Sequence, residues 1–287
     1  MREKPEEPVW FDTHAHLQSD DFDQDRQAVL QRAQQQCVRQ ILLPASNYAD
    51  ALRAVEIAEQ QPGLCCAVGC HPHEANHFSE QTMAEWLDLV QQKRQAPIVA
   101  IGEIGLDYHY DFSPRLVQQR VFRSQLELAS TLDLPVIIHE REATEDCLNL
   151  LEKAARDGLL RSLPGVFHCF SGSVETGRRV RDLGFYLGFD GPVTFKNARK
   201  SLAVIAECPT DCLLLETDSP YLTPVPYRGK RNEPSYLPLI GEKVAVIWQL
   251  SVAETAASTT ANARWLYGVS RANDPGSHHS TGCYARL

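Results

Sequence analysis

Five hydrophobic segments of the chain each reach a histidine or an acidic residue: VWFDTHAH, IVAIGEIGLD, LPVIIHEREA, GVFHCFSG and LLLETDSP. Short apolar runs between turn signals are typical of strands buried on both faces, as in a parallel sheet covered by helices. We expect each segment to be such a strand and the polar residues to be its last ones. These residues are His14 and His16, Glu103, His139, His168 and Asp218.

Helix-like segments separate these strands in a regular rhythm, with a repeat of roughly 25 to 35 residues. The first is an amphipathic stretch over 23–36, and about eight strand–helix units follow one another along the chain. Eight such units close a barrel, which favours an α/β fold of the (β/α)8 TIM-barrel type over an open doubly wound sheet. Two more helices, from about Tyr236 and from about Val252, end the fold near Tyr267.

Length and composition fit one such barrel, because TIM barrels of about 250 residues form a single domain. We predict one domain over 1–271. The tail 272–287 lacks hydrophobic periodicity and is expected to be disordered. No apolar run is long enough for a membrane span, and MREKPEEPVW has no apolar core typical of a secretory signal. Nine cysteines without a CxxC pair indicate free thiols, and so a cytoplasmic protein. No obligate protein partner is predicted.

The six polar residues at the strand ends predict a metal site. In a parallel barrel all carboxyl ends open onto one face, so ligands far apart in sequence converge there. Taken singly, His139 and His168 could be core histidines, and Asp218 could cap the turn before Pro220. Six such residues at predicted strand ends favour a common function over six independent explanations. We expect the four imidazoles and two carboxylates to bind two divalent ions, with Glu103 bridging them.

The identity of the ions stays open between Mg²⁺ or Mn²⁺, which suit phosphate chemistry, and Zn²⁺, which suits the histidines. Cys169 is the one thiol at a strand end, and it alternates away from His168. A thiolate-rich zinc site is therefore disfavoured.

Basic residues near this mouth predict where a phosphate binds. Arg141 follows His139 by two residues and offers a planar fork to a phosphate. Positive charges follow Asp218 in the loop YLTPVPYRGKRNEP, namely Arg228, Lys230 and Arg231. His71 and His73 in GCHPH either contact the substrate or only shape their loop. The net charge of −9 disfavours a grip on long duplex DNA but allows one or two phosphates to bind at metal ions.

Together these motifs resemble the TatD family of metal-dependent deoxyribonucleases, which are amidohydrolase-type barrels. The resemblance runs from about Val9 to Tyr267 and rests on FDTHAHL, GCHPH, AIGEIGLDY, LPVIIHEREA, FHCFSG, ETDSPYLTPVPYRGKRNEP and TTANARWLYG. By this similarity the metal ligands fall on the same six residues, and a glutamate stands where related barrels have a carboxylated lysine.

The resemblance implies hydrolysis of phosphodiester bonds in DNA, with exonuclease action on single strands, and a catalytic role for Glu103 and Asp218. Asp218 would orient or deprotonate the attacking water, while the ions and Arg141 would neutralise charge in the transition state. One rival is an amidohydrolase or aminoacyl-tRNA deacylase that uses the same metal pair on a carbonyl. The other is a barrel that has lost turnover, which the complete ligand set disfavours.

Overall fold

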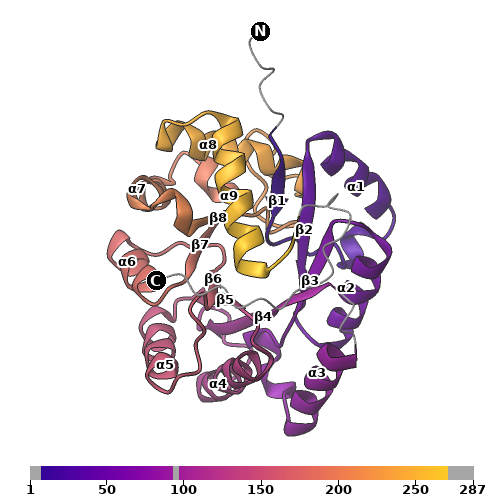
Figure 1. Cartoon of the computed structure of the whole chain (residues 1–287), viewed down its shortest axis with the longest axis vertical. Coiled ribbons are helices and arrows are strands. Elements are labelled where there is room, and N and C mark those ends of the chain that lie inside the picture. The colour runs from indigo at the N-terminus through magenta and orange to yellow at the C-terminus, as the bar shows by residue number, and fades with distance from the viewer. Residues whose placement is uncertain (1–7, 93–96, 271–287) are drawn as a thin grey trace.

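The computed structural model describes residues 8–92 and 97–270. Parallel strands follow one another in chain order around a nearly closed barrel, so that each strand pairs with the next (Figure 1). They are β1 Trp10–Asp12, β2 Val38–Pro44, β3 Leu64–Val68, β4 Ile98–Asp107, β5 Val136–Arg141, β6 Gly165–Phe167, β7 Tyr186–Phe189 and β8 Leu213–Leu215. The predicted (β/α)8 TIM barrel is confirmed.

Helices surround this barrel on the outside, and the last of them, α9, lies across one end (Figure 1). They are α1 Arg26–Gln35, α2 Tyr48–Gln60, α3 Glu80–Gln92, α4 Arg115–Leu132, α5 Thr144–Arg156, α6 Val174–Asp182, α7 Arg199–Glu207, α8 Leu237–Trp248 and α9 Val252–Tyr267. The helix expected over 23–36 starts later than predicted. It begins at Arg26, and residues 23–25 form a turn that follows a separate 3₁₀ turn over Asp20–Phe22, which the side chain of Ser19 caps by accepting from the Asp21 N–H.

The two helices predicted at the end of the fold are α8 and α9. The start of α9 follows from its sequence, because Ser251 and Glu254 form a capping box in which each side chain accepts the backbone N–H of the other residue. Its end is set by Gly268, whose φ of 65° is the left-handed conformation that glycine adopts readily.

Helix α9 closes the amino-terminal end of the barrel. Leu266 and Tyr267 pack into a core cluster with the strand residues that fill the interior of the barrel, among them Phe11 and Leu214. The buried Asn262 amide donates to the carbonyl oxygen of Leu213, the first residue of β8, at 2.9 Å. With this end filled, the opposite end of the barrel is where polar side chains gather.

The seam between β8 and β1 is closed by backbone hydrogen bonds. Thr13 N donates to Leu215 O at 3.1 Å, and Asp218 N donates to His14 O at 2.8 Å. Another bond, of 2.7 Å, runs from His16 N to Ser219 O. The seam therefore holds His14, His16 and Asp218, three of the predicted ligands, in one network of main-chain bonds.

We expect Gly241→Ala to destabilise the fold, because α8 approaches β1 closely at this point. A Cβ on Gly241 would lie 2.2 Å from the indole of Trp10, which is buried. Overpacking of this kind costs roughly 1–3 kcal/mol of unfolding free energy. Urea titration measures the loss, and Val246→Ala on an exposed position of the same helix is the control. Equal midpoints for the two variants would show that Trp10 moves aside without cost.

The described residues include no helix long and apolar enough to cross a membrane. The tail predicted to be disordered, 272–287, lies outside the described residues. The single domain over 1–271 stays a prediction.

Candidate metal centre

Glu103 lies within β4 rather than at its end, so the expectation that it closes its strand is wrong. The apolar residues Ile104 and Leu106 continue the strand to Asp107, and the pairing with β5 shifts between Ile101 and Ile104. His139 is likewise followed by two more residues of β5. Both side chains nevertheless reach the cluster predicted at the mouth of the barrel.

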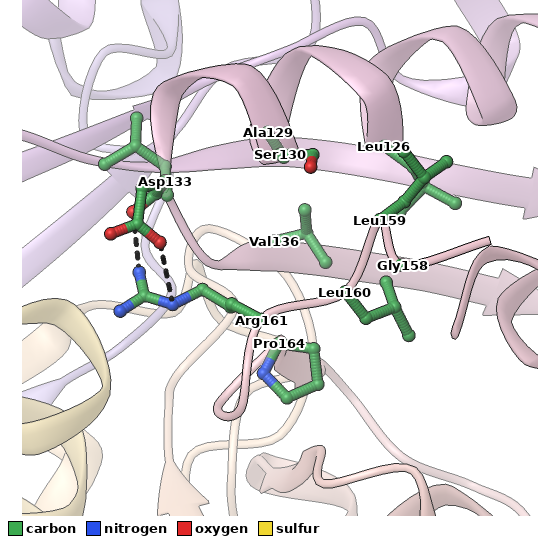
Figure 2. A pocket seen from close by; sticks show the side chains of 11 residues that line it. Leu126, Ala129, Ser130, Asp133, Val136, Gly158, Leu159, Leu160, Arg161 and Pro164 are labelled. Atoms are coloured by element: carbon green, nitrogen blue, oxygen red, sulfur yellow. Dashed lines mark hydrogen bonds and ion pairs between the residues drawn. The ribbon is translucent and has the colours of Figure 1, made fainter. Parts of the chain in front are cut away.

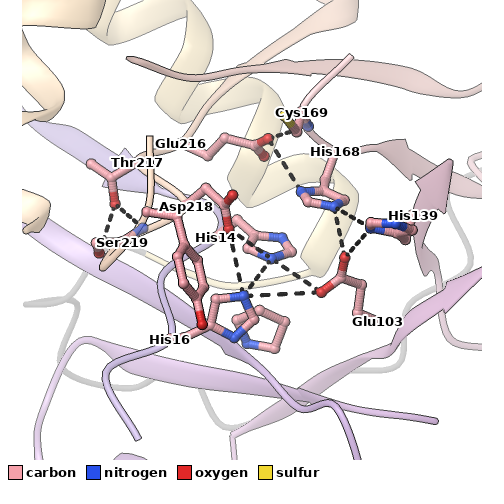
Figure 3. Close-up of polar contacts among 12 residues, drawn as sticks. His14, His16, Glu103, His139, His168, Cys169, Glu216, Thr217, Asp218 and Ser219 are labelled. Atoms are coloured by element: carbon pink, nitrogen blue, oxygen red, sulfur yellow. Dashed lines mark hydrogen bonds and ion pairs between the residues drawn. The ribbon is translucent and has the colours of Figure 1, made fainter. Parts of the chain in front are cut away.

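The carboxylate of Glu103 is the centre of that cluster, and its two oxygens face different partners (Figure 3). Oε1 lies 2.9 Å from Nδ1 of His139 and 2.7 Å from Nε2 of His168. On the other side, Oε2 lies 3.5 Å from Nε2 of His14 and 4.0 Å from Nε2 of His16. One carboxylate thus joins two pairs of imidazoles that come from opposite parts of the barrel.

Asp218 completes the half of the cluster that contains the seam histidines. Its Oδ1 lies 3.5 Å from Nε2 of His16 and 3.7 Å from Nε2 of His14. The two imidazole nitrogens are themselves only 3.2 Å apart. All six residues of the predicted ligand set are therefore brought together.

The separations between the imidazole nitrogens fit the coordination shell of an ion, whereas the 2.9 and 2.7 Å from Glu103 Oε1 to His139 and His168 are hydrogen-bond lengths. Ligand atoms about 2.1 Å from a tetrahedral ion lie about 3.4 Å from one another. Around Glu103 Oε1 the nitrogens of His139 and His168 are 3.3 Å apart, and the 3.2 Å between His14 and His16 is similar. Imidazole nitrogens and carboxylate oxygens are also donors that Zn²⁺, Mn²⁺ and related ions accept. The residues present therefore fit divalent metal binding.

Burial sets the electrostatics of these ligands. Burial would raise the pKa of Glu103, but His168, His71 and His139 hold it well below its usual range. Burial lowers the pKa of His14 to about 4, so this imidazole is neutral at pH 7 and has a free lone pair. Burial also lowers the pKa of His168, but the adjacent Glu103 carboxylate outweighs it and raises that pKa to about 10. A cation near Glu103 would replace the proton that this carboxylate otherwise attracts to His168.

A second carboxylate orients the histidines on the β5 side. Asp107 Oδ2 lies 3.0 Å from Nε2 of His139 and 2.9 Å from Nε2 of His73. The bond to His139 leaves its Nδ1 directed at Glu103, which is the arrangement by which outer carboxylates fix a metal-binding imidazole. His71 is also buried, with Nε2 3.7 Å from Glu103 Oε1. Both histidines of GCHPH therefore lie in the cluster, and a role in substrate contact stays a prediction.

A pocket of about 190 Å³ elsewhere in the barrel has no such chemistry. Figure 2 shows it beneath the end of α4, with Asp133 and Arg161 paired at its edge. Val136, the first residue of β5, lines it, so it lies at the opposite end of that strand from the cluster. None of the predicted site residues lines this pocket.

Comparison with known proteins identifies the family. A family model described as TatD related DNase matches residues 11–268. The chain belongs to this family. It is 42% identical over 259 residues to the metal-dependent hydrolase YabD of Bacillus subtilis, covering 90% of this chain and 99% of that protein. It is 37% identical over 267 residues to the 3'-5' ssDNA/RNA exonuclease TatD of Salmonella typhimurium, covering 90% of this chain and 99% of that protein.

Solved structures agree with this assignment. The TatD homologue YjjV from Escherichia coli superposes with a TM-score of 0.84 at 33% identity, covering 91% of this chain and 98% of that one. The phosphotriesterase homology protein from Escherichia coli superposes with a TM-score of 0.60 at 16% identity, which shows the fold alone. The predictions of a TatD-family barrel and of a metal-dependent hydrolase acting on ester bonds are confirmed at this level.

The four basic residues predicted to bind phosphate have different surroundings in this TatD-family barrel. Arg141 is exposed at the end of β5, with its guanidinium carbon 4.8 Å from the ring centroid of Tyr110. Arg231 forms an ion pair with Asp25 at 2.7 Å. Of the other two, Arg228 lies over the ring of Phe195 at 4.1 Å, and Lys230 lies 5.4 Å from the ring centroid of Tyr227. Their contacts with substrate stay predictions.

Sequence reasoning missed three acidic residues of this cluster. Asp107 is the last residue of β4, Asp190 directly follows β7, and Glu216 directly follows β8. The rule that selected the other ligands, an acidic residue at the carboxyl end of an apolar strand, would have found them. Burial raises the pKa of Asp190 to about 7 and that of Glu216 to about 8. Asp190 and Asp218 also have oxygens within 4.8 Å of the Cys169 sulfur.

Proposed function

We propose that this protein hydrolyses phosphodiester bonds in single-stranded DNA as an exonuclease, with two divalent ions at the mouth of its barrel. The observation that carries the proposal is the Glu103 carboxylate, whose two oxygens face two separate groups of donors. Two ions bridged by one carboxylate lie about 3.5 to 4 Å apart and clamp the attacking and leaving oxygens of a phosphoryl group.

Each ion would have its own ligands. One group consists of His14, His16, Asp218 and Oε2 of Glu103. The other consists of His139, His168 and Oε1 of Glu103. The second group has fewer protein donors, so it is the one with room for a substrate oxygen. Mg²⁺, Mn²⁺ and Zn²⁺ all fit such donors.

Bound divalent ions would polarise the phosphoryl group and lower the pKa of a water molecule. The protein residues supply the rest of the chemistry. Asp218 would accept a proton from the attacking water and would hold that water in line with phosphorus. Its side chain is buried, with 8% of the residue exposed. Arg141 would place its guanidinium on a phosphate oxygen as negative charge develops.

The choice of single-stranded DNA rests on the relatives and on charge. The TatD relative from Salmonella typhimurium is described as a 3'-5' ssDNA/RNA exonuclease. The net charge of −9 in this chain opposes the many phosphate contacts that long duplex DNA requires. A single strand that enters the mouth needs only the ions and a few local cations.

We also propose that the protein works in the cytoplasm without an obligate protein partner. In the described part of the chain five cysteines are both buried and free, namely Cys65, Cys66, Cys70, Cys147 and Cys208. Buried free thiols are usual in the reducing cytoplasm.

The test of the proposed function combines metal analysis with a substrate panel. Protein saturated with Mn²⁺, Mg²⁺ or Zn²⁺ should retain two equivalents after desalting, measured by elemental analysis. It should shorten end-labelled single-stranded DNA from one end, with slower action on blunt duplex. Ester, amide and aminoacyl-tRNA substrates are tested in parallel. No more than one equivalent, or turnover confined to carbonyl substrates, would contradict the proposal.

A further inference from the structure

Two aromatic side chains are exposed together beside the metal centre, in the loop between β4 and α4. Tyr110 is 48% exposed and Phe112 is 64% exposed. Their rings are nearly parallel, with an interplanar angle of 17° and centroids 5.4 Å apart. We call these residues the Tyr110–Phe112 pair. Large aromatic rings exposed next to one another indicate a binding surface, because leaving such area in water is unfavourable.

A single imidazole, that of His73, lies between the Tyr110–Phe112 pair and the proposed metal ligand His139. The ring of His73 stands edge-on to both residues, with centroids 5.4 Å from Tyr110 and 4.9 Å from Phe112. The same ring is 6.2 Å from that of His139. A group bound on the exposed aromatic surface is therefore close to a substrate phosphate at the centre.

Hydrogen bonds hold this loop in place. Asp107 Oδ1 accepts the backbone N–H groups of His109 and Tyr110, both at 3.0 Å. The side chain of Gln118, buried in α4, accepts from Asp107 N at 2.8 Å and donates to Ser113 O at 2.8 Å. Both ends of the loop are thus fixed to α4. A surface held in this way loses little conformational entropy when a ligand binds.

One cation lies directly beside the pair, while the carboxylate of the intervening Asp111 is ion-paired with Arg115. The guanidinium of Arg141 lies over the ring of Tyr110 and is exposed. An aromatic face next to a cation is the combination with which proteins hold single-stranded nucleic acids, the ring for a base and the cation for its phosphate.

We propose that the Tyr110–Phe112 pair stacks an unpaired base of the nucleotide next to the phosphodiester at the metal centre. The inference rests on the proposed function and extends it, because it gives the reason for a single-strand preference. In a duplex each base is covered by its neighbours and paired, so its face becomes available to Phe112 only when the strand is single.

The test compares natural and abasic substrates in three proteins: wild type, Phe112→Ala and Trp265→Ala. Trp265 is the control, because it is 61% exposed but belongs to α9 at the other end of the barrel. Short single-stranded DNA carries an abasic site on one side of the scissile bond, then on the other. Loss of one base stack should raise the KM of natural DNA by roughly 5-fold or more in Phe112→Ala, with kcat unchanged.

The abasic substrate separates stacking from a structural effect. With the abasic site on one of the two sides of the scissile bond, wild type should bind the abasic DNA as weakly as Phe112→Ala binds natural DNA. The affinity of Phe112→Ala should not fall further when natural DNA is replaced by this abasic DNA. Phe112→Trp should restore tight binding, because it keeps a flat ring. Equal KM values for natural and abasic DNA in wild type, or for Phe112→Ala and Trp265→Ala on natural DNA, would overturn the proposal.

A binding measurement keeps this result independent of turnover. A strand with 2-aminopurine at that position and an uncleavable linkage should lose fluorescence when it binds wild type, and should lose much less with Phe112→Ala. If no phosphodiester is cleaved but this quenching occurs, the proposed function fails and base stacking stands. If natural DNA is cleaved without any quenching, the proposed function stands and base stacking fails.

Discussion

Glu103→Gln is expected to lose one bound ion and to cut the rate of DNA hydrolysis more than any other single change in the cluster. The amide keeps one oxygen for one pair of histidines, but its NH₂ group then faces the other pair. That pair is either His139 and His168, whose nitrogens lie 2.7–2.9 Å from the carboxylate oxygen in the wild type, or His14 and His16, at 3.5–4.0 Å. An amide nitrogen cannot ligate a cation. Removal of an outer carboxylate already costs roughly 10–100-fold in affinity or activity, so loss of the bridge should exceed about 100-fold.

The measurements for Glu103→Gln are elemental analysis at saturating metal and cleavage of single-stranded DNA. Glu142→Gln is the matched control, because its carboxylate is exposed near the same mouth and pairs with His109. The control should keep two equivalents and full activity. Two tightly bound ions together with normal cleavage in Glu103→Gln would contradict the proposal that Glu103 bridges two ions.

The barrel and the cluster of candidate metal ligands at its mouth were predictable from the sequence for a topological reason. In a parallel barrel every strand delivers its following residues to one end, so finding the strands also locates the cluster. His168 directly follows β6, and Asp218 follows β8 by three residues, as the apolar runs GVF and LLL suggested. The prediction needed no knowledge of which strands pair.

The position of Glu103 within its strand was not predictable in the same way. IVAI and GEIGLD are both compatible with a strand, so the sequence does not say where β4 ends. The shift in pairing between Ile101 and Ile104 is a property of the sheet, decided by contact with β5. Long-range pairing also decides the surroundings of Arg231, because its partner Asp25 lies some two hundred residues earlier in the chain.

The aromatic surface beside the site was missed because exposure cannot be read from a short motif. The segment GLDYHYDF is rich in aromatic residues, which usually indicate a buried strand or core. The buried Gln118 side chain bonds both ends of the loop instead, so Phe112 is left facing solvent. Only the packing of α4 against β4 reveals this.

Asp218→Asn is expected to separate proton transfer from metal binding. The amide keeps an oxygen close to His14 and His16, where the carboxylate Oδ1 now lies 3.7 and 3.5 Å from their Nε2 atoms. It cannot accept a proton from the attacking water. General-base catalysis contributes roughly 10²- to 10⁴-fold, so kcat should fall by about that factor. KM should change little, because other groups hold the substrate phosphate.

Asp211→Asn is the control for this substitution, because Asp211 is exposed just before β8, at the opposite end of the strand from Asp218. Single-turnover cleavage and metal content are measured for both variants. A variant that keeps two ions and loses kcat supports the role of Asp218 as proton acceptor. If kcat is unchanged, another group takes the proton. If the ion held beside His14 and His16 is lost together with activity, Asp218 acts as a ligand alone, and the two imidazoles cannot hold that ion without its negative charge.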